Sequence, residues 1–600
     1  MKKIVNLSIA TALFIATNTY AEDDLGMITI SSATKSTQSI QNVTSNVEVI
    51  SNIELEEKHV QTVSEALNSL AGISISGNGG LGQRDSLFIR GVDTKRILIL
   101  VDGIRYNEPT GLSGAPLAQL MIDDVERIEV VKGAQSGIWG ADASGGVVNI
   151  ITKKAKDGVH GSLLAEAGSF NTKKYNASLS AKKGKYSFKI DANKITTDGY
   201  SAYEPKQGSA DYGKRGKDLG LEKDGYENMT YTLQSAVNLT DNDTVDLLYK
   251  NIDAQYDYDS STGDNLINKS FINHYFKALN YTHTVDNYSM KLTASQSRFD
   301  RKQDTFYAQS KVNEFSLQND IKYNSEDIFI FGLNKQNFED TENKQKYQTS
   351  ALFISNLNKF DKLVLSETLR YDNNNAFDEK VTGKFGVKYN FQEEFYLSTN
   401  YGTAYNAPTL GNLSYTSTLK PETTKSYDIS VYFNKFKATY FRSDITDMIQ
   451  YVAGSWPNTA YENLSGKSKL KGYEFEYKND IMQDTLISLN YVILDARNNN
   501  DEKLARRAKK SFKASIDYYG FDKLHLGLNA QYVGTRYDKD DEEGAQTGRY
   551  TIANVVANYD ITKNLKIYGK VDNITDKYYQ TSDGYATSAR AYYAGVKVSF

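Results

Sequence analysis

Two acidic stretches near the middle of the chain carry residue types that bind a hard cation. The first occupies positions 222–225 and the second positions 253–259. Calcium binds roughly six to eight oxygen atoms, many of them from carboxylates, so two neighbouring acidic loops could hold one ion together. The candidate ligands are Glu222, Asp224, Asp253, Asp257 and Asp259. The same pattern is also typical of two solvated acidic loops, because runs of charge usually face water.

The sequence offers no grouping of residues that is typical of an enzyme. Cysteine is absent, which excludes a thiol nucleophile and a thiolate metal site, and no Ser/His/Asp arrangement is recognisable. His274, His283 and His525 fall in segments with strand patterns, which argues against an exposed haem ligand. We therefore expect a protein that is not an enzyme, with no catalytic residues and no catalytic cofactor. A protease or lipase is the alternative from that class.

The segment from Gly79 to Lys154 predicts a small mixed α/β domain. Short apolar runs at 97–101 and 147–151 alternate with glycine turns and charged pairs. Asp102-Gly103 is typical of a hairpin turn between apolar runs. Upstream, apolar residues at 63, 66, 67 and 70 predict a short amphipathic helix. The domain should span about residues 45–155.

Beyond Lys154 the chain changes to strands of alternating polarity. At 565–572 the odd positions are apolar or small and the even positions polar, and 524–532 repeats this pattern. Such strands present one face to lipid and the other to water or an enclosed domain. With roughly 20 residues for each strand and its loop, residues 156–600 predict about 22 antiparallel strands. Barrels of that size enclose a plugged lumen.

Composition supports a membrane barrel over a series of soluble domains. There are 44 tyrosines and 25 phenylalanines, which suit the aromatic girdles at membrane surfaces. The mean hydropathy is −0.54, and after the N-terminus no apolar run is long enough for a membrane helix. The net charge of −4 gives nucleic acid no overall attraction. The last strand, 592–600, also alternates and ends on Phe600.

The N-terminus has the pattern of an export signal followed by a flexible segment. Residues 1–21 contain two lysines, an apolar stretch and a small-residue cleavage site, which predicts a signal peptide. Residues 22–44 are rich in serine, threonine and asparagine, with one short apolar alternation. That alternation consists of Met27, Ile28, Thr29, Ile30 and Ser31. Its pattern suits an edge strand that adds to a partner's sheet.

Five motifs in the α/β segment resemble the plug of TonB-dependent outer-membrane receptors. They are Phe88-Ile89-Arg90-Gly91, Val101-Asp102-Gly103, Glu126-Arg127-Ile128-Glu129, Lys132-Gly133 and the run 140–150. The resemblance implies a 22-stranded barrel at 156–600, a plug at 45–155 and a TonB box at 27–31. It also implies TonB with ExbB and ExbD as partners, and a monomer in the outer membrane of a Gram-negative bacterium. Charges of the plug, such as Arg90, would be buried against the barrel and need ionic partners.

Within that family, further segments look like the cobalamin receptors. These segments are 402–413, 504–509, 533–540 and 572–579. The resemblance implies uptake of cobalamin or a related corrinoid, and calcium in the external loops. The ligand contacts it implies are Arg84, Asp85, Ser86, Gly111, Leu112, Ser113, Arg506 and Tyr585. A ferric siderophore receptor of the same fold is the alternative, because such receptors differ from this one mainly in their loops.

Overall fold

The computed structural model describes residues 29–304, 306–324, 326–452 and 460–600. The predicted signal peptide, together with Met27 and Ile28, lies outside these residues. Within the described part of the chain, no helix has the length and apolar character needed to cross a membrane.

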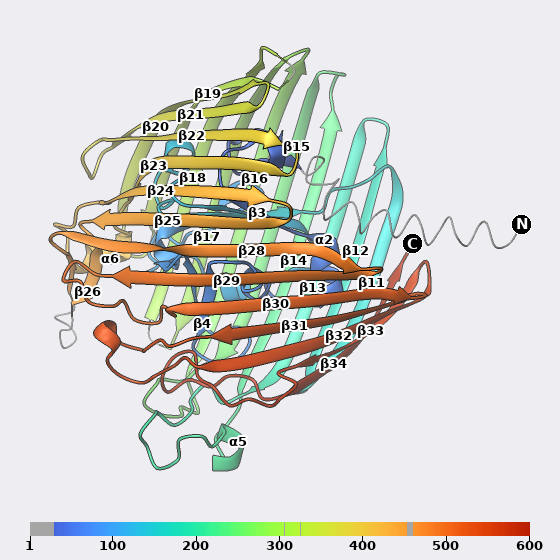
Figure 1. Ribbon diagram of the computed structural model, residues 1–600, viewed down its shortest axis with the longest axis vertical. Coiled ribbons are helices and arrows are strands. Elements are labelled where there is room, and N and C mark those ends of the chain that lie inside the picture. The colour runs from blue at the N-terminus through green and yellow to red at the C-terminus, as the bar shows by residue number, and fades with distance from the viewer. Residues whose placement is uncertain (1–28, 305, 325, 453–459) are drawn as a thin grey trace, which may run out of the picture.

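A closed barrel of 22 strands, all in the described part of the chain, forms most of the molecule (Figure 1). Sequence neighbours pair antiparallel throughout, and the first strand closes the ring by pairing with the last, Ser162 opposite Ser599. The strands are β11 (Gly158–Gly168), β12 (Thr172–Lys183), β13 (Tyr186–Tyr200), β14 (Asp224–Asn238), β15 (Asp243–Asp257), β16 (Lys269–Val285), β17 (Tyr288–Gln303), β18 (Phe306–Lys322), β19 (Ile328–Asp340), β20 (Gln345–Phe360), β21 (Leu363–Asn374), β22 (Lys380–Gln392), β23 (Phe395–Asn406), β24 (Glu422–Phe433), β25 (Phe436–Thr446), β28 (Lys467–Met482), β29 (Thr485–Arg497), β30 (Lys510–Phe521), β31 (Leu524–Val533), β32 (Tyr550–Thr562), β33 (Leu565–Asp572) and β34 (Ala591–Ser599). The predicted fold class and strand number are therefore confirmed.

Alternation along each strand separates an apolar outer face from a polar lumen. In β33, Ile567 is 40% exposed whereas Tyr568 and Lys570 are buried. Ile567 belongs to a broad set of exposed aliphatic and aromatic side chains on the outer face of the barrel. A surface of that kind is stable in lipid and not in water.

The two ends of the barrel differ. At one end, which we call the turn end, strands are joined by short turns such as Gly184–Lys185. The carboxyl terminus lies there too, and Phe600 exchanges two backbone hydrogen bonds with Gly161. At the other end, the loop end, long connections carry α5 (Gly216–Leu219), α6 (Leu410–Tyr415), β26 (Ile449–Val452) and β27 (Ala460–Asn463).

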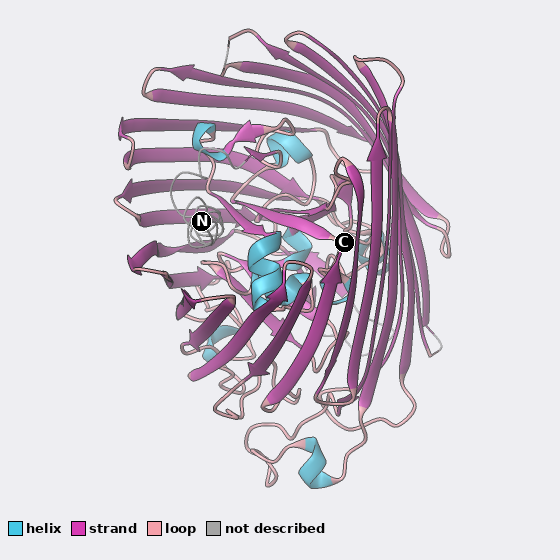
Figure 2. Ribbon diagram, turned by 90° about the vertical axis from the view of Figure 1, so that its right-hand side faces the viewer, coloured by secondary structure: helices cyan, strands magenta, loops and turns pink. Residues whose placement is uncertain are grey.

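A small α/β domain, the plug, fills the lumen (Figure 2). Its main sheet has the order β3-β9-β10-β7-β8, in which only β10 and β7 run parallel. Asp102 and Gly103 both have positive φ, 49° and 81°, as the predicted hairpin turn requires. The elements are β3 (Val47–Ser51), α2 (Asn52–Lys58), α3 (Val63–Leu67), β4 (Ile73–Gly77), β5 (Asp85–Ile89), β6 (Val92–Asp93), β7 (Ile97–Val101), β8 (Ile104–Arg105), β9 (Val125–Lys132), α4 (Ser136–Trp139) and β10 (Gly146–Thr152).

Candidate functional site

The turn between β4 and β5, residues 78–84, reaches from the plug toward the loop end, and we call it the apex turn. Gly82 has φ +81°, and a Cβ there would lie 2.2 Å from the ring of Tyr226. Gly79 approaches Ala202 in the same way, and Gln83 donates to the backbone carbonyl of Asp257 at 2.6 Å. Glycine is needed here because only its backbone can come this close to the barrel loops.

Three guanidinium groups and two tyrosines lie within electrostatic range of one another at the apex turn. They belong to Arg84, Arg301, Arg506, Tyr256 and Tyr585, which together we call the apical site. Enclosure by the barrel lowers the pKa of Arg84, and the nearby guanidinium groups of Arg301 and Arg506 lower it further. The positive charge of Arg84 is thus poorly compensated until an anion binds beside it.

The carboxylate partners of these arginines are few. Arg506 pairs with Asp538 at 2.7 Å, and Arg301 reaches Glu108 at 3.5 Å. Arg84 is exposed to the space above the plug and has no carboxylate partner among the described residues. An anionic ligand with aromatic groups would complement this arrangement, since guanidinium groups bind anions and stack on rings.

The structure separates the predicted contacts of the first apical segment. Arg84 and Tyr585 lie in the apical site, but Asp85 lines a cavity of about 200 Å³ inside the plug. Burial raises the pKa of Asp85 to about 6. Ser86 pairs with Ser76 within the small sheet. Consecutive strand residues point to opposite faces, so Arg84 and Asp85 do not both face the ligand space.

The second predicted segment packs against a barrel loop. Gly111 is buried, whereas Leu112 is exposed and Ser113 half-buried. The backbone carbonyl of Pro109 accepts a hydrogen bond from the amide of Leu410, which begins α6. Leu112 and Ser113 therefore remain accessible from the loop end.

Sequence reasoning missed Arg301, Tyr256 and Arg507. Arg507 stacks 4.5 Å over Phe88 and donates to the carbonyl of Gly91, so it holds the plug instead of facing ligand. For Arg301, the available signal was a basic residue near the loop end of a predicted strand. Nothing in the sequence places it beside Arg84.

Three of the predicted calcium ligands come together beside the apex turn. One carboxylate oxygen each from Glu222, Asp224 and Asp259 lie within 4.8 Å of one another, and we call these residues the carboxylate cluster. The backbone amide of Ala202 donates to Asp224 Oδ2 at 2.5 Å. Asp224 is 4% exposed, and its Oδ1 has no hydrogen-bond partner among the described residues. A buried carboxylate oxygen without a partner fits a cation ligand, because desolvation is otherwise uncompensated.

The other two predicted ligands do not join this cluster. In β15, Ile252 and Ala254 are buried in the lumen, so Asp253 between them is exposed on the outer face. Asp257 lies on the same face of the strand and pairs with Lys269 at 3.1 Å. The prediction was wrong for Asp253 because the alternation of the strand turns its side chain away.

The described part of the predicted TonB box is folded against the plug, although the segment was expected to be flexible. Thr29–Ile30 forms β1, which pairs with β2 (Gln38–Ser39), and Ile30 is 1% exposed. The Glu129 carboxylate accepts from the amide of Ser31 at 3.0 Å and from the amide and hydroxyl of Ser32. These hydrogen bonds to a buried carboxylate hold the segment in place.

Buried ion pairs join the plug to the wall, as the burial argument predicted for Arg90. Its guanidinium group contacts Asp428 at 3.3 Å and Glu474 at 2.8 Å. Lys132 reaches the same Glu474 at 3.3 Å. Glu129 was expected to pair with the wall in the same way. Its carboxylate instead accepts hydrogen bonds from the N-terminal segment and from Arg127, both within the plug.

Two family models match the chain. One is described as TonB dependent receptor-like, beta-barrel, and matches residues 166–574. The other, TonB-dependent Receptor Plug Domain, matches residues 39–147. The matched ranges agree with the barrel and the plug of the structure, and the first covers more than half of the chain.

Solved structures of siderophore receptors are similar to this chain over nearly its whole length. PirA from Acinetobacter baumannii is 18% identical with a TM-score of 0.79, covering 93% of this chain and 99% of that one. A mutant of the ferric enterobactin receptor PfeA from Pseudomonas aeruginosa, in complex with enterobactin, is 18% identical with a TM-score of 0.77, covering 92% of this chain and 99% of that one. PirA from Pseudomonas aeruginosa is 20% identical with a TM-score of 0.72, covering 92% and 99%. At these identities the likeness shows the fold.

Proposed function

The chain belongs to the TonB-dependent receptors, a family of transport receptors and not of enzymes, and on that premise we propose that it imports a ferric siderophore. The observation that carries this proposal is the apical site, where the exposed Arg84 of the apex turn lies within electrostatic range of two further arginines and two tyrosines. An iron complex of three ionised catechols is anionic, because three dianionic catecholates outweigh the charge of Fe³⁺, and the catechols add aromatic rings. Arginine binds such groups by charge-assisted hydrogen bonds and by stacking.

The structural neighbours support this ligand class over the corrinoid that sequence resemblance suggests. Each of the three solved relatives is a siderophore receptor, and one holds enterobactin. Cyanocobalamin carries no net negative charge, so it would leave the charge of Arg84 uncompensated. Cargo would bind at the loop end outside the cell, and TonB, energised by ExbB and ExbD, would act on the plug from the turn end in the periplasm.

Calorimetric titration of the purified protein tests the ligand class. We expect ferric enterobactin to bind and cyanocobalamin to bind weakly or not at all. Arg84→Gln should weaken binding of the ferric complex by roughly ten- to a hundredfold, because a hydrogen bond to a charged group contributes about 1.5–3 kcal/mol. Arg590→Gln is the control, because Arg590 is an exposed arginine at the barrel end of the external loop that carries Tyr585. Tight binding of cyanocobalamin alone would reject the siderophore and restore the corrinoid.

We also propose that the carboxylate cluster binds calcium and thereby orders the loop at 201–223. The fit rests on the unpartnered oxygens of Asp224 and Glu222 and on the preference of calcium for carboxylates. Asp224 holds the amide of Ala202, and Ala202 in turn lies against Gly79 of the apex turn. Calcium bound here would therefore support the position of the apical site.

Calcium titration of Asp224→Asn checks this proposal. We expect the variant to lose calcium binding, and chelation of calcium from the wild type to weaken ligand binding and expose the loop at 201–223 to protease. Asp253→Asn, on the outer face of the neighbouring strand, should bind calcium as the wild type does. Burial and the nearby Asp264 raise the pKa of Glu222 to about 7, so protons should compete and calcium affinity should fall as the pH drops through about 7. If Asp224→Asn binds calcium as tightly as the wild type does, the carboxylate cluster is not a calcium site, and the two acidic stretches are solvated loops.

A further inference from the structure

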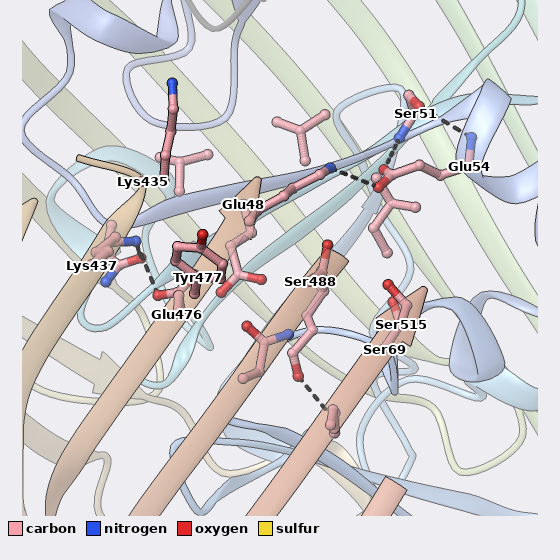
Figure 3. Close-up of a pocket in the computed structure, with 18 of the residues that line it drawn as sticks. Glu48, Ser51, Glu54, Ser69, Lys435, Lys437, Glu476, Tyr477, Ser488 and Ser515 are labelled. Carbon is pink, nitrogen blue, oxygen red and sulfur yellow. Dashed lines mark hydrogen bonds and ion pairs between the residues drawn. The ribbon is translucent and has the colours of Figure 1, made fainter. Parts of the chain in front are cut away.

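A large cavity separates the plug from one sector of the barrel wall. Its volume is about 1350 Å³, larger than the roughly 300–1,000 Å³ of a usual ligand pocket. Plug residues 40–51 line one side, and strands from β22 to β33 line the other. Figure 3 shows Glu48 of the plug facing Lys437 and Glu476 of the wall across this space. Residues of the short turns, such as Asp361 and Glu394, also line it, so the cavity reaches the turn end.

Five lumen-facing lysines follow the wall of this cavity, and we call them the wall lysines. They are Lys388 on β22, Lys437 on β25, Lys478 on β28, Lys513 on β30 and Lys570 on β33. Away from the turns, the carboxylates that the described wall adds to the lining are Glu476 and Asp572. The wall itself is therefore net positive in this sector.

Each wall lysine donates to an oxygen atom of the plug, within residues 41–73. Lys478 and Lys570 pair with plug carboxylates, at Glu54 and Glu65. The other three donate to neutral oxygens: Lys388 to the carbonyl of Gln41 at 2.7 Å, Lys437 to the amide oxygen of Asn46 at 3.0 Å, and Lys513 to the carbonyls of Leu70 and Ile73 at 2.8 and 2.6 Å. Movement of the plug would remove all of these plug partners together, whereas Lys437 and Lys570 would keep the wall carboxylates Glu476 and Asp572 at 3.2 Å each.

Two of these lysines have unusual environments for a buried charge. Lys388 and Lys513 are 6% and 7% exposed, and neither has a carboxylate within ion-pair distance among the described residues. Buried ammonium groups are normally paired with carboxylates, because desolvating an unpaired charge is costly. Lys388 also lies 4.2 Å over the ring of Tyr396, so hydrogen bonds and an aromatic ring hold these groups without a counter-charge. An ammonium group without a counter-charge can attract a mobile anion. Rings of lysine or arginine select anions in other pores by the same means.

We propose that cargo crosses the lumen along this cavity, between plug residues 40–51 and the wall from β22 to β33, and that the wall lysines make the path selective for anions. The inference rests on the proposed function, since it takes the cargo to be an anionic iron complex. When the plug segment moves, the ammonium groups exchange plug oxygens for those of the cargo. The positive wall then raises the local concentration of the anion along its route.

Ion selectivity of the full-length protein in a planar lipid bilayer tests the path without any siderophore. Urea is added to loosen the plug, which lacks the continuous strand pairing that closes the barrel. The reversal potential in a potassium chloride gradient then reports which ion passes more readily. We expect chloride to be preferred, and the double variant Lys388→Gln, Lys513→Gln to lower the chloride-to-potassium permeability ratio by about twofold or more. Lys388→Arg with Lys513→Arg should retain the preference.

Lys510→Gln is the matched control, because Lys510 is exposed on the outer face of β30. Its permeability ratio should equal that of the wild type. A preference for potassium, a double glutamine variant that matches the wild type, or no conductance at any urea concentration below barrel unfolding would overturn the inference.

Transport in cells supplies a second measurement. With ferric enterobactin as probe, the double glutamine variant should keep its dissociation constant and lose about fivefold in uptake rate. An unchanged uptake rate would contradict the path. If the wild type does not bind this probe, the proposed function fails, while the bilayer measurement still decides the inference.

Discussion

Glu474→Ala is expected to detach the plug from the wall and to abolish controlled transport. The Glu474 carboxylate is fully buried and is shared by Arg90 at 2.8 Å and Lys132 at 3.3 Å. Removing it leaves two buried cations that Asp428 and Glu48 compensate in part. Breaking a buried ionic network by deleting one partner costs about 3–5 kcal/mol. That is a large share of the stability of a small domain.

Two measurements check this expectation. The plug of Glu474→Ala should become sensitive to trypsin at a lower urea concentration than that of the wild type. Cells that carry the variant should also become sensitive to vancomycin, which is too large to pass a closed receptor. Glu227→Ala is the control, because Glu227 forms an exposed pair with Lys194 at 2.7 Å, and such pairs contribute about 1 kcal/mol or less. If Glu474→Ala and Glu227→Ala show the same trypsin sensitivity and the same vancomycin sensitivity, the ionic network around Glu474 does not hold the plug in place.

The strands of the barrel could be predicted from the sequence, but the ion-pair partners of individual charged residues could not. Alternation at 565–572 and 524–532 predicted strands that the structure has as β33 and β31. The burial of Arg90 followed from its place in a plug inside a polar wall. Its partners Asp428 and Glu474 lie more than three hundred positions away. They could not be predicted, because strand register and barrel stagger decide which wall residue faces which part of the plug.

Loop conformation limits prediction of the candidate site in the same way. Arg506 and Arg507 are adjacent in sequence, yet one pairs with Asp538 in the external loop and the other reaches Gly91 of the plug. Arg506 has φ +61°, a backbone conformation that no propensity signals for arginine. Asp253 reverses the usual alternation of a membrane barrel, because Ile252 and Ala254 on either side of it are buried in the lumen. The rule that apolar residues face lipid would have placed the Asp253 side chain in the lumen.

The TonB box of the proposed mechanism requires an extended segment that can leave the plug and pair with TonB. The described residues of the box show which contacts with the plug must break before the segment can pair with TonB. Ile30 is buried against Val43 and Val131, and Glu129 holds the amides of Ser31 and Ser32. Pairing with a partner strand depends on backbone hydrogen bonds, so side-chain changes that keep the strand should matter less than loss of an amide.

Ile28→Pro is therefore expected to abolish uptake while leaving ligand binding at the cell surface unchanged. Proline has no amide hydrogen and restricts φ, so it removes a hydrogen bond from any strand formed with TonB. Ile28 precedes the docked residues, and the apical site lies at the opposite end of the plug, so binding should be insensitive to the change. Uptake of ferric enterobactin by cells should fall to the level of cells without TonB, whereas its dissociation constant should match that of the wild type. Ile28→Val keeps the amide and the apolar side chain and should transport normally. Normal uptake in Ile28→Pro would place the TonB contact elsewhere in residues 22–44, and loss of surface binding would instead point to damage in the plug.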